Sequence, residues 1–131
     1  MVEERRRVAS GAPWEETVGY SRAVRVGDRV LVAGTTAIVD GEPAHEGDAY
    51  QQTRVALSII GQALAAAGAD LGDVVRTRIF TTDISLWRDI GRAHGEVFRN
   101  IRPASTMVQV QALIDPRLLV EIEVEAIVAR P

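Results

Sequence analysis

Two polar clusters contain the residue types best suited to holding a small molecule. In the first, Gly19–Val24, Tyr20 lies just ahead of a strand-like run. Its phenol could line a pocket as a hydrogen-bonding handle, or it could be an ordinary half-buried aromatic side chain. In the second, Arg102–Val108, the hydroxyl residues Ser105 and Thr106 stand where a loop becomes a strand. Because backbone amides at such a junction can hold a carboxylate or a water molecule, these clusters indicate ligand binding without specifying a reaction.

The composition excludes several kinds of chemistry. The chain has 131 residues and no cysteine, which excludes thiol nucleophiles, disulfides, zinc–cysteine sites and iron–sulfur clusters. It also has no lysine, which excludes a lysine Schiff base and conventional pyridoxal-phosphate chemistry. The two histidines, His45 and His94, have no recognisable metal-site spacing, and no G-x-S-x-G, Walker or G-x-G-x-x-G motif is present. We therefore expect neither a cofactor nor a metal.

Charge and hydropathy narrow the range of partners. The formal net charge of −3 argues against nucleic acid as the main partner, since phosphate binding needs a basic face. The Arg5–Arg7 cluster is best interpreted as the solvated start of an edge strand, with an anionic-partner patch as the alternative. No apolar run approaches the ~20 residues that span a bilayer, and residues 1–7 do not resemble a signal peptide. We expect a cytoplasmic protein that forms one domain over residues 1–131.

Hydrophobic periodicity predicts a strand-rich chain with two helices, enough for a sheet of five or six strands. Turns are marked by Gly-Asp at 27–28, Asp-Gly at 40–41 and Asp-Pro at 115–116. The predicted elements are strands over 23–26 and 29–37, a loop over 41–47, a helix over 48–67, a strand over 73–82, a helix over 85–98, and strands over 104–113 and 118–128.

The two predicted helices each have an apolar stripe. The first has Asp48 at its start as a capping residue and Gly68 just past its end, and its stripe comprises Leu57, Ile60, Leu64 and Ala67. Ser85 is the expected cap of the second, whose stripe comprises Trp87, Ile90, His94, Val97 and Phe98. Because His94 lies on this stripe, a partly buried histidine is a plainer interpretation than a catalytic triad member.

The final strand alternates strictly between apolar and acidic residues. One face holds Val120, Ile122, Val124, Ala126 and Val128, and the other holds Glu121, Glu123 and Glu125. The strand over 73–82 has Arg76 and Arg78 on one face, so pairing of the two strands would set Arg against Glu. Such pairs could be weak solvated contacts, each worth roughly 0–1 kcal/mol.

The sheet has more surface than two helices can cover. Thr77, Ile79 and Met107 stand among the charged residues of these strands, which suggests that the uncovered face is partly buried. We therefore expect an oligomer in which the uncovered sheet faces meet.

The ordered set of short motifs resembles the RidA (YjgF, endoribonuclease L-PSP) family over nearly the whole chain. The matching segments are 19–24, 32–35, 67–69, 74–77, 83–84, 102–104 and 119–123, with the two helices in the same order. The resemblance implies a chorismate-mutase-like α+β fold, with a mixed sheet of about six strands and two helices packed on one face. It also implies a homotrimer whose sheets form a central barrel, and small-molecule pockets between subunits. Well-known members of the family hydrolyse 2-imino and 2-enamino acids to 2-keto acids and ammonia.

The resemblance also implies which residues form the site. Glu121 matches the acid that orients or activates the attacking water, although an interface ion pair with Arg22, Arg76 or Arg78 is an equal alternative. The other residues of the implied substrate site are Tyr20, Arg22, Ala33, Gly34, Gly91, His94, Ser105, Thr106 and Met107.

Several of these positions depart from the family pattern. Ser105 stands where active deaminases have an arginine that clamps the substrate carboxylate. Gly91, His94 and Met107 stand at positions where the family often has an asparagine, an aromatic residue and a small thiol or hydroxyl residue. Losing a charge-assisted contact typically costs roughly 100-fold or more in binding or rate. Arg22 and Arg102 are candidates to replace the clamp.

Three functions remain open from the sequence. The first is hydrolytic deamination of an imine or enamine, or a related water addition or tautomerisation. The second is small-molecule binding or regulation without turnover, which the missing arginine supports. The third is a ribonuclease or translation-inhibitor role, against which the acidic balance counts.

Overall fold

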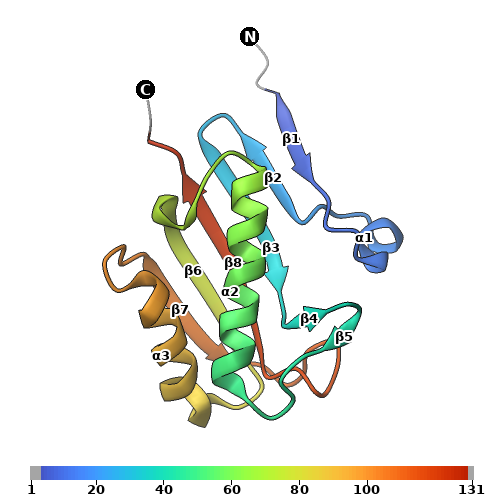
Figure 1. The fold of residues 1–131 in the computed structure, drawn as a ribbon, viewed down its shortest axis with the longest axis vertical. Helices are drawn as coiled ribbons and strands as arrows, with labels where there is room; N and C mark the ends of the chain where they lie inside the picture. The colour runs from blue at the N-terminus through green and yellow to red at the C-terminus, as the bar shows by residue number, and fades with distance from the viewer. Residues whose placement is uncertain (1–3, 130–131) are drawn as a thin grey trace.

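A computed structural model describes residues 4–129, and its two longest helices lie on one face of a six-stranded sheet (Figure 1). The N-terminal residues 1–3 of the segment tested for a signal peptide, and both ends of the expected 1–131 domain, lie outside the described residues. The elements are β1 (Arg5–Val8), α1 (Pro13–Val18), β2 (Ala23–Val26), β3 (Arg29–Thr35), β4 (Ile38–Val39), β5 (Glu42–Pro43), α2 (Ala49–Ala66), β6 (Val74–Thr81), α3 (Trp87–Phe98), β7 (Ala104–Gln109) and β8 (Val120–Ile127). Short 3₁₀ helices, Leu71–Asp73 and Ile84–Leu86, precede β6 and α3.

The sheet is mixed, as predicted, and its strand order is β1-β2-β3-β8-β6-β7. All neighbouring strands are antiparallel except β6 and β7, which are parallel because α3 returns the chain to the same end of the sheet. The last strand, β8, lies between β3 and β6, and both neighbours pair with it antiparallel. This insertion places the acidic face of β8 in the middle of the sheet.

The predicted helix over 48–67 is confirmed almost to the residue. The Asp48 carboxylate caps α2 by accepting a hydrogen bond from the Gln51 N–H at 3.0 Å. Gly68 follows the helix with φ +80°, the left-handed conformation that glycine adopts without a Cβ penalty. The turn at 27–28 is also confirmed, since it joins β2 to β3. The turn at 40–41 joins β4 to β5.

Several predicted boundaries are wrong. The strand over 29–37 ends at Thr35, the loop over 41–47 contains β5, and α1 was not predicted because its six residues show no sustained periodicity. The helix over 85–98 begins at Trp87, and Ser85 is not its cap. Ser85 instead lies in the preceding 3₁₀ turn, where its N–H donates to the Asp83 carboxylate at 3.0 Å.

The two final strands are shorter than predicted and are not neighbours. β7 ends at Gln109 and β8 begins at Val120, so a longer connection that includes the turn near Pro116 joins them. β6 lies between them in the sheet. The sequence predicted both strands but could not show which partner each one takes.

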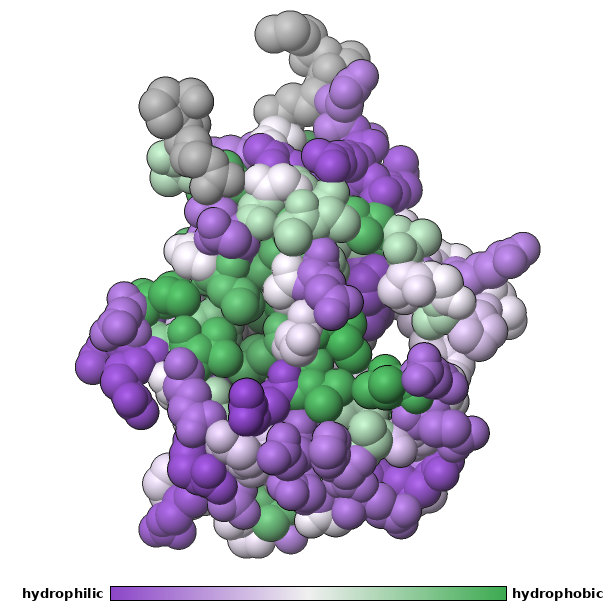
Figure 2. All heavy atoms as spheres, in the orientation of Figure 1, coloured by the Kyte–Doolittle hydropathy of each residue, from purple (hydrophilic) through white to green (hydrophobic). Residues whose placement is uncertain are grey.

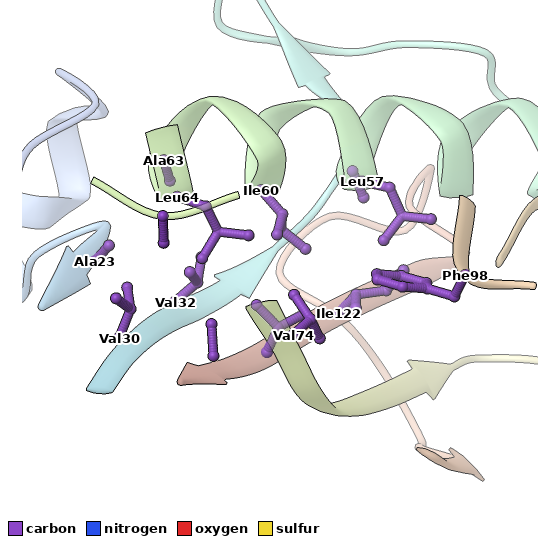
Figure 3. Packing of buried hydrophobic residues seen from close by; sticks show 14 of the residues in the cluster. Ala23, Val30, Val32, Leu57, Ile60, Ala63, Leu64, Val74, Phe98 and Ile122 are labelled. Carbon is purple, nitrogen blue, oxygen red and sulfur yellow. The ribbon is translucent and has the colours of Figure 1, made fainter. Parts of the chain in front are cut away.

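The core lies between the sheet and α2. Leu57, Ile60 and Leu64 are fully buried and point from α2 toward the inward residues of β3 and β8 (Figure 3). The predicted α2 stripe is therefore confirmed, and burial of each large aliphatic side chain contributes roughly 1.5–3 kcal/mol. In α3, Ile90 and Phe98 are buried as predicted, but Trp87 is 48% exposed. Figure 2 shows hydrophobic surface gathered in the middle of this helix-bearing face.

The opposite face of the sheet bears no helix, as predicted. We call it the open face. Its charged rows contain Glu121, Glu123 and Glu125 of β8, with Arg76 and Arg78 of β6. Arg78 lies 3.3 Å from carboxylate oxygens of Glu123 and Glu125, and Arg76 lies 3.8 Å from Glu125. The expected pairing of Arg against Glu is confirmed.

One argument for burial of the open face was wrong. Thr77 and Ile79 are buried on the helix-bearing side, and Met107 packs against the same core. Because side chains alternate along a strand, Thr77 and Ile79 lie on the opposite face of β6 from Arg76 and Arg78. The apolar residues of the open face include Val24, Leu31, Phe80 and Val108. Val24 and Phe80 are half-buried, whereas Leu31 and Val108 are exposed.

β1 forms one edge of the sheet. Arg5, Arg6 and Arg7 are exposed on it, so their interpretation as a solvated edge strand is confirmed. No helix among residues 4–129 is long and apolar enough to cross a membrane. Within the same range, no group of three or more His, Asp or Glu residues could hold a metal ion.

Candidate functional site

The turn after α1 sets the position of Tyr20. Helix α1 ends at Gly19, whose φ of +90° reverses the chain, and the N–H groups of Gly19 and Tyr20 both donate to the Glu15 carbonyl at 2.9 Å. Two residues later the Arg22 guanidinium lies 5.7 Å from the centre of the Tyr20 ring, within range of a cation–π contact. The predicted first polar cluster is therefore a locally ordered unit.

Arg22 also joins this cluster to β3. Its guanidinium donates to the Gly34 carbonyl at 3.1 Å and to the Thr35 hydroxyl at 3.2 Å. The Ala33 N–H donates to the Arg22 carbonyl at 2.9 Å. Nε of Arg22 is buried and has no hydrogen-bond partner among the described residues. Both terminal nitrogens of the Arg22 guanidinium thus donate to the protein itself, which argues against Arg22 as a free substrate clamp.

Glu121 lies directly against Gly34. The ladder between β3 and β8 shifts register between Val32 and Thr35, and Gly34 falls within this irregular stretch. A Cβ built on Gly34 would collide with Oε2 of Glu121 and would lie 3.0 Å from its Cδ. Only glycine therefore leaves room for the carboxylate in this position.

The Glu121 carboxylate is half-buried and has no hydrogen bond or ion pair with another described residue. Burial raises the pKa of Glu121, the nearby Arg22 charge lowers it, and Glu123 raises it further. Arg76 and Arg78 pair with Glu123 and Glu125 instead, so an ion pair of Glu121 with either arginine does not form within the chain. A partly desolvated carboxylate without a partner is well suited to accept a proton.

A second group of predicted residues lies on the helix-bearing side of the sheet, near β7. The His94 imidazole Nε2 lies 2.9 Å from the Thr77 hydroxyl, which lies 2.8 Å from the Ser105 hydroxyl. This chain of hydrogen bonds links α3, β6 and β7. It can run in either direction because both hydroxyl groups rotate. His94 is half-buried, and burial lowers its pKa, which favours the neutral imidazole.

The remaining residues of this group fill out its surroundings. Gly91 lies three residues before His94 on α3, and a Cβ at Gly91 would meet nothing within 4 Å. Met107 faces inward beside Ile79 and packs against the core. A depression of about 340 Å³ adjoins His94 and is lined in part by Arg102. Of the two candidate clamps, Arg102 lines this depression and Arg22 does not.

The structure divides the predicted site residues between the two faces of the sheet. Tyr20, Arg22, Ala33, Gly34 and Glu121 lie together, and we call them the Glu121 group. The helix-bearing side holds what we call the His94 group, which comprises Gly91, His94, Ser105 and Met107. Thr106 belongs to neither group: it faces the open face beside Arg78, but β6 separates its strand, β7, from the strand of Glu121. No small molecule could contact both groups within one chain.

An open depression of about 580 Å³ lies on the open face beside Tyr20. Its lining includes Ala33, Leu31 and the ion-paired side chains of Arg78, Glu123 and Glu125. Glu121 follows in the same acidic row of β8. The depression is therefore part of the open face and adjoins the Glu121 group through Tyr20 and Ala33.

Sequence reasoning missed two contributors. Thr77 connects His94 to Ser105, and the available signal was its alternation with Arg76 and Arg78, which turns it to the opposite face of the strand from the two arginines. Arg99 lines the depression beside His94 with Arg102. The spacing of Arg99 and Arg102 across the end of the second predicted helix was the available signal, since residues three apart on a helical turn are neighbours.

Comparisons of the sequence place these features among known proteins. Residues 11–128 match the family model described as Endoribonuclease L-PSP. The uncharacterized protein SCO2049 of Streptomyces coelicolor is 48% identical over 121 residues, covering 92% of this chain and 90% of the relative. The 3-aminoacrylate deaminase RutC of Acinetobacter baylyi is 36% identical over 104 residues, covering 79% of this chain and 82% of the relative.

Comparison with solved structures agrees. The structure of Rv2704 from Mycobacterium tuberculosis, a member of the YjgF/YER057c/UK114 family, superimposes with a TM-score of 0.88. It is 54% identical and covers 95% of this chain and all of its own. The structure of PA3499 from Pseudomonas aeruginosa, a protein of unknown function, has a TM-score of 0.85 at 33% identity, covering 98% and 95%.

Proposed function

The chain belongs to the endoribonuclease L-PSP family, and from this premise we propose that it hydrolyses a small imine or enamine, with Glu121 handling the attacking water. The state of Glu121 carries the proposal. Its carboxylate is half-buried, lies against Gly34, and is without a hydrogen bond or ion pair to another described residue. Such a carboxylate is available to a water molecule.

The chemistry needs one proton acceptor at this point. Water adds to the carbon of the C=N bond of the imine, or of the imine tautomer of an enamine, and Glu121 takes the proton that the water loses. The proton then passes to nitrogen, which gives a carbinolamine. As the carbon–nitrogen bond breaks, Glu121 transfers the proton of the new hydroxyl group to nitrogen, and a carbonyl product and ammonia leave. Because burial raises the pKa of Glu121, its ionised form is a stronger base than an exposed glutamate.

The neighbours of Glu121 have supporting roles. The Tyr20 phenol positions the substrate by a hydrogen bond, with its ring held by the Arg22 guanidinium. Gly34 leaves the space that the carboxylate and the water need. These roles require no metal and no cofactor.

Assembly from several copies would complete the site. The His94 group lies on the other side of the sheet from Glu121, so a neighbouring subunit must supply it to the same pocket. The uncovered open face, with its exposed Leu31 and Val108, is suited to face a second copy. We propose a homotrimer whose pockets lie between subunits, and sedimentation equilibrium tests it directly: a stable monomer would refute the composite site.

Imine hydrolysis tests the activity. An amino-acid oxidase generates a short-lived imino acid, whose decay is followed with native protein, Glu121→Gln and the matched control Glu123→Gln. Glu123 is the next acid on the same face but is ion-paired with Arg78. We expect native protein and the control to accelerate decay, and Glu121→Gln to lose roughly 100-fold or more. Equal rates for the two variants would refute the role of Glu121.

A binding function without turnover is the second candidate. Ser105 and Thr77 form a neutral hydrogen bond where relatives of known deaminase pattern would place a cation, and this observation favours it. The same assay includes Ser105→Arg. If native protein is inert and Ser105→Arg is active, the pocket is competent and its natural ligand is not an imino acid of this class.

A further inference from the structure

Arg22 acts on several parts of the Glu121 group but takes no step in the proposed reaction. Its guanidinium lies 5.7 Å from the centre of the Tyr20 ring and donates to the Gly34 carbonyl at 3.1 Å. It also donates to the Thr35 hydroxyl at 3.2 Å, and its positive charge acts on Glu121. One half-buried side chain therefore links the segment before β2 to the part of β3 that lies against the carboxylate.

The hydrogen bonds of Arg22 fix the irregular stretch of β3. The ladder between β3 and β8 shifts register just before Thr35, and Gly34 has no register partner on β8. Arg22 bonds the Gly34 carbonyl directly. The buried Thr35 hydroxyl, which accepts from Arg22, also donates to the Ala33 carbonyl at 2.8 Å. The guanidinium thus holds the stretch that the ladder leaves unpaired, at the point where Gly34 forms a wall beside Glu121.

The charge of Arg22 reaches Glu121 without occupying its carboxylate. Within residues 4–129 no ion pair or hydrogen bond joins the two side chains. The residues beside Glu121 on the neighbouring strands, Gly34 of β3 and Phe80 of β6, carry no charge. Nε of Arg22 is buried and has no hydrogen-bond partner among the described residues, so water screens this side of the guanidinium little. The carboxylate therefore has a nearby positive charge while its oxygens stay open to a water molecule.

The other charged group that acts on Glu121 has the opposite sign. Burial is the main cause that raises the pKa of Glu121, the Arg22 charge lowers it, and Glu123 on the same strand raises it. The Glu123 carboxylate is itself paired with Arg78 at 3.3 Å. The remaining titratable group beside Arg22 is the Tyr20 phenol. In the described part of the chain, Arg22 is therefore the cation that favours ionisation of Glu121.

We propose that Arg22 is a positioning residue for Glu121, which fixes the wall of β3 beside the carboxylate and keeps the carboxylate ionised with its oxygens free for water. The inference rests on the proposed function, because the ionised form of Glu121 is the one that takes a proton from the attacking water. Arginine suits both parts of this role. Its planar guanidinium donates in several directions at once, and it stays protonated throughout the working pH range of proteins.

Substitutions at Arg22 separate its charge from its hydrogen bonds. Arg22→Gln removes the charge, whereas Arg22→Lys keeps the charge but cannot hold two acceptors in the same planar geometry. Arg25→Gln is the matched control. Arg25 lies on β2 and donates to the carbonyls of Ala67 and Gly68 at the end of α2, so it places an equal charge on the helix-bearing side of the sheet. Urea denaturation checks that each variant folds, and Arg22→Met repeats the test if Arg22→Gln does not.

Carbon NMR of protein labelled at its glutamate carboxylates reports the ionisation of Glu121 without turnover, and Glu121→Gln assigns the resonance. We expect Arg22→Gln to raise the pKa of Glu121, because the opposing positive charge is gone. Arg22→Lys and Arg25→Gln should leave this pKa near its native value.

The pH profile of imine hydrolysis gives the second readout. In Arg22→Gln the acid limb of kcat/KM should move to higher pH, so that the loss relative to native protein is roughly tenfold greater at about pH 5 than at about pH 8. Arg22→Lys should keep the native shape of the profile but lose kcat at every pH, because it does not hold the wall of β3. Arg25→Gln should follow the native profile.

An unchanged pKa of Glu121 in Arg22→Gln would overturn the inference, as would an equal shift in Arg25→Gln. Full kcat in Arg22→Lys would overturn the part that concerns the wall of β3. Because the NMR readout needs no turnover, the two proposals can fail separately. Hydrolysis by native protein without a shift in Arg22→Gln would refute this inference alone, whereas the expected shift in a protein that does not hydrolyse imines would refute the proposed activity alone.

Discussion

Substitution of Gly34 by alanine tests the geometry around Glu121 most directly. A methyl group at Gly34 would occupy the place of Oε2 of Glu121 and would press on its Cδ and Cγ, at 3.0 and 3.3 Å. The carboxylate is the flexible end of a side chain, so it can move away, and the backbone of Gly34 is not in the left-handed region. Alanine should therefore displace the carboxylate without preventing folding.

The expected magnitudes follow from this displacement. A shift of about 1 Å in a catalytic group can cost roughly 100-fold in rate. Replacement of Gly by Ala at a compatible position changes stability by about 0.4–1 kcal/mol in the favourable direction, which offsets part of the cost of moving the carboxylate. We expect Gly34→Ala to lose about 100-fold in kcat/KM for imine hydrolysis, with a free energy of unfolding within ~1 kcal/mol of the native value.

Two readouts separate this reasoning from a general loss of structure. Urea denaturation checks the free energy of unfolding, and the double variant Gly34→Ala/Glu121→Gln checks whether Gly34 acts through Glu121. The double variant should be no slower than Glu121→Gln alone, because the base is already absent. NMR of the Glu121 carboxylate should show its pKa falling toward the ordinary value near 4.5 in Gly34→Ala, as the displaced group gains solvent.

Full activity in Gly34→Ala would refute this role of Gly34. So would a double variant whose loss of kcat/KM equals the product of the losses in the two single variants. A Glu121 pKa that stays raised in Gly34→Ala would show that the methyl group does not move the carboxylate.

Three further predictions concern stability. Burial raises the pKa of Glu121 above its unfolded value, so the stabilising contribution of its bound proton is fully present below about pH 4.5 and is lost as pH rises through the raised pKa. Glu121→Gln should therefore be more stable than the native protein at pH 7 in thermal unfolding. A difference in stability that stays constant at all pH values would contradict this. Gln52 is fully buried; its side-chain nitrogen donates hydrogen bonds to the carbonyls of Ala44, His45 and Arg117, and its side-chain oxygen accepts one from the Leu119 N–H. Gln52→Leu should therefore lower the free energy of unfolding by roughly 3 kcal/mol and Tm by roughly 10 °C. The control Arg54→Gln, at an exposed position, should leave Tm nearly unchanged. Gly91 lies within α3 with open space around it, so Gly91→Ala should stabilise the protein by about 0.5–1 kcal/mol in urea denaturation, and a loss of stability would show that the space is not free.

The local elements could be predicted because their signals are local. Helix α2 follows from its apolar stripe, its Asp48 cap and the glycine after its end. Strand β8 follows from strict alternation, which puts Glu121 on the face away from the core whatever its neighbours are. The order of the short motifs identified the family, and the family in turn predicted a sheet with helices on one face.

Cap positions and short elements could not be predicted as well. Ser85 and Trp87 were assigned to one helix because the pattern runs through both, but a 3₁₀ turn capped by Asp83 intervenes and leaves Trp87 exposed. Helix α1 is too short for periodicity to show, and it is stabilised by contacts of the buried Glu15 with Ser10 and the following turn.

The site itself needed the tertiary structure. The sequence determined which residue types are available: an acid on an alternating strand, a glycine on a second strand, and a histidine on an apolar stripe. Only the fold decided that β8 lies between β3 and β6, which brings Glu121 against Gly34. It also decided the parity of β6 and β7, that is, which of their residues face the helices and which face the open side. A register shift of one residue would move each side chain to the other face. That parity turns Thr77 and Ser105 toward His94, and it separates the His94 group from the Glu121 group by the thickness of the sheet.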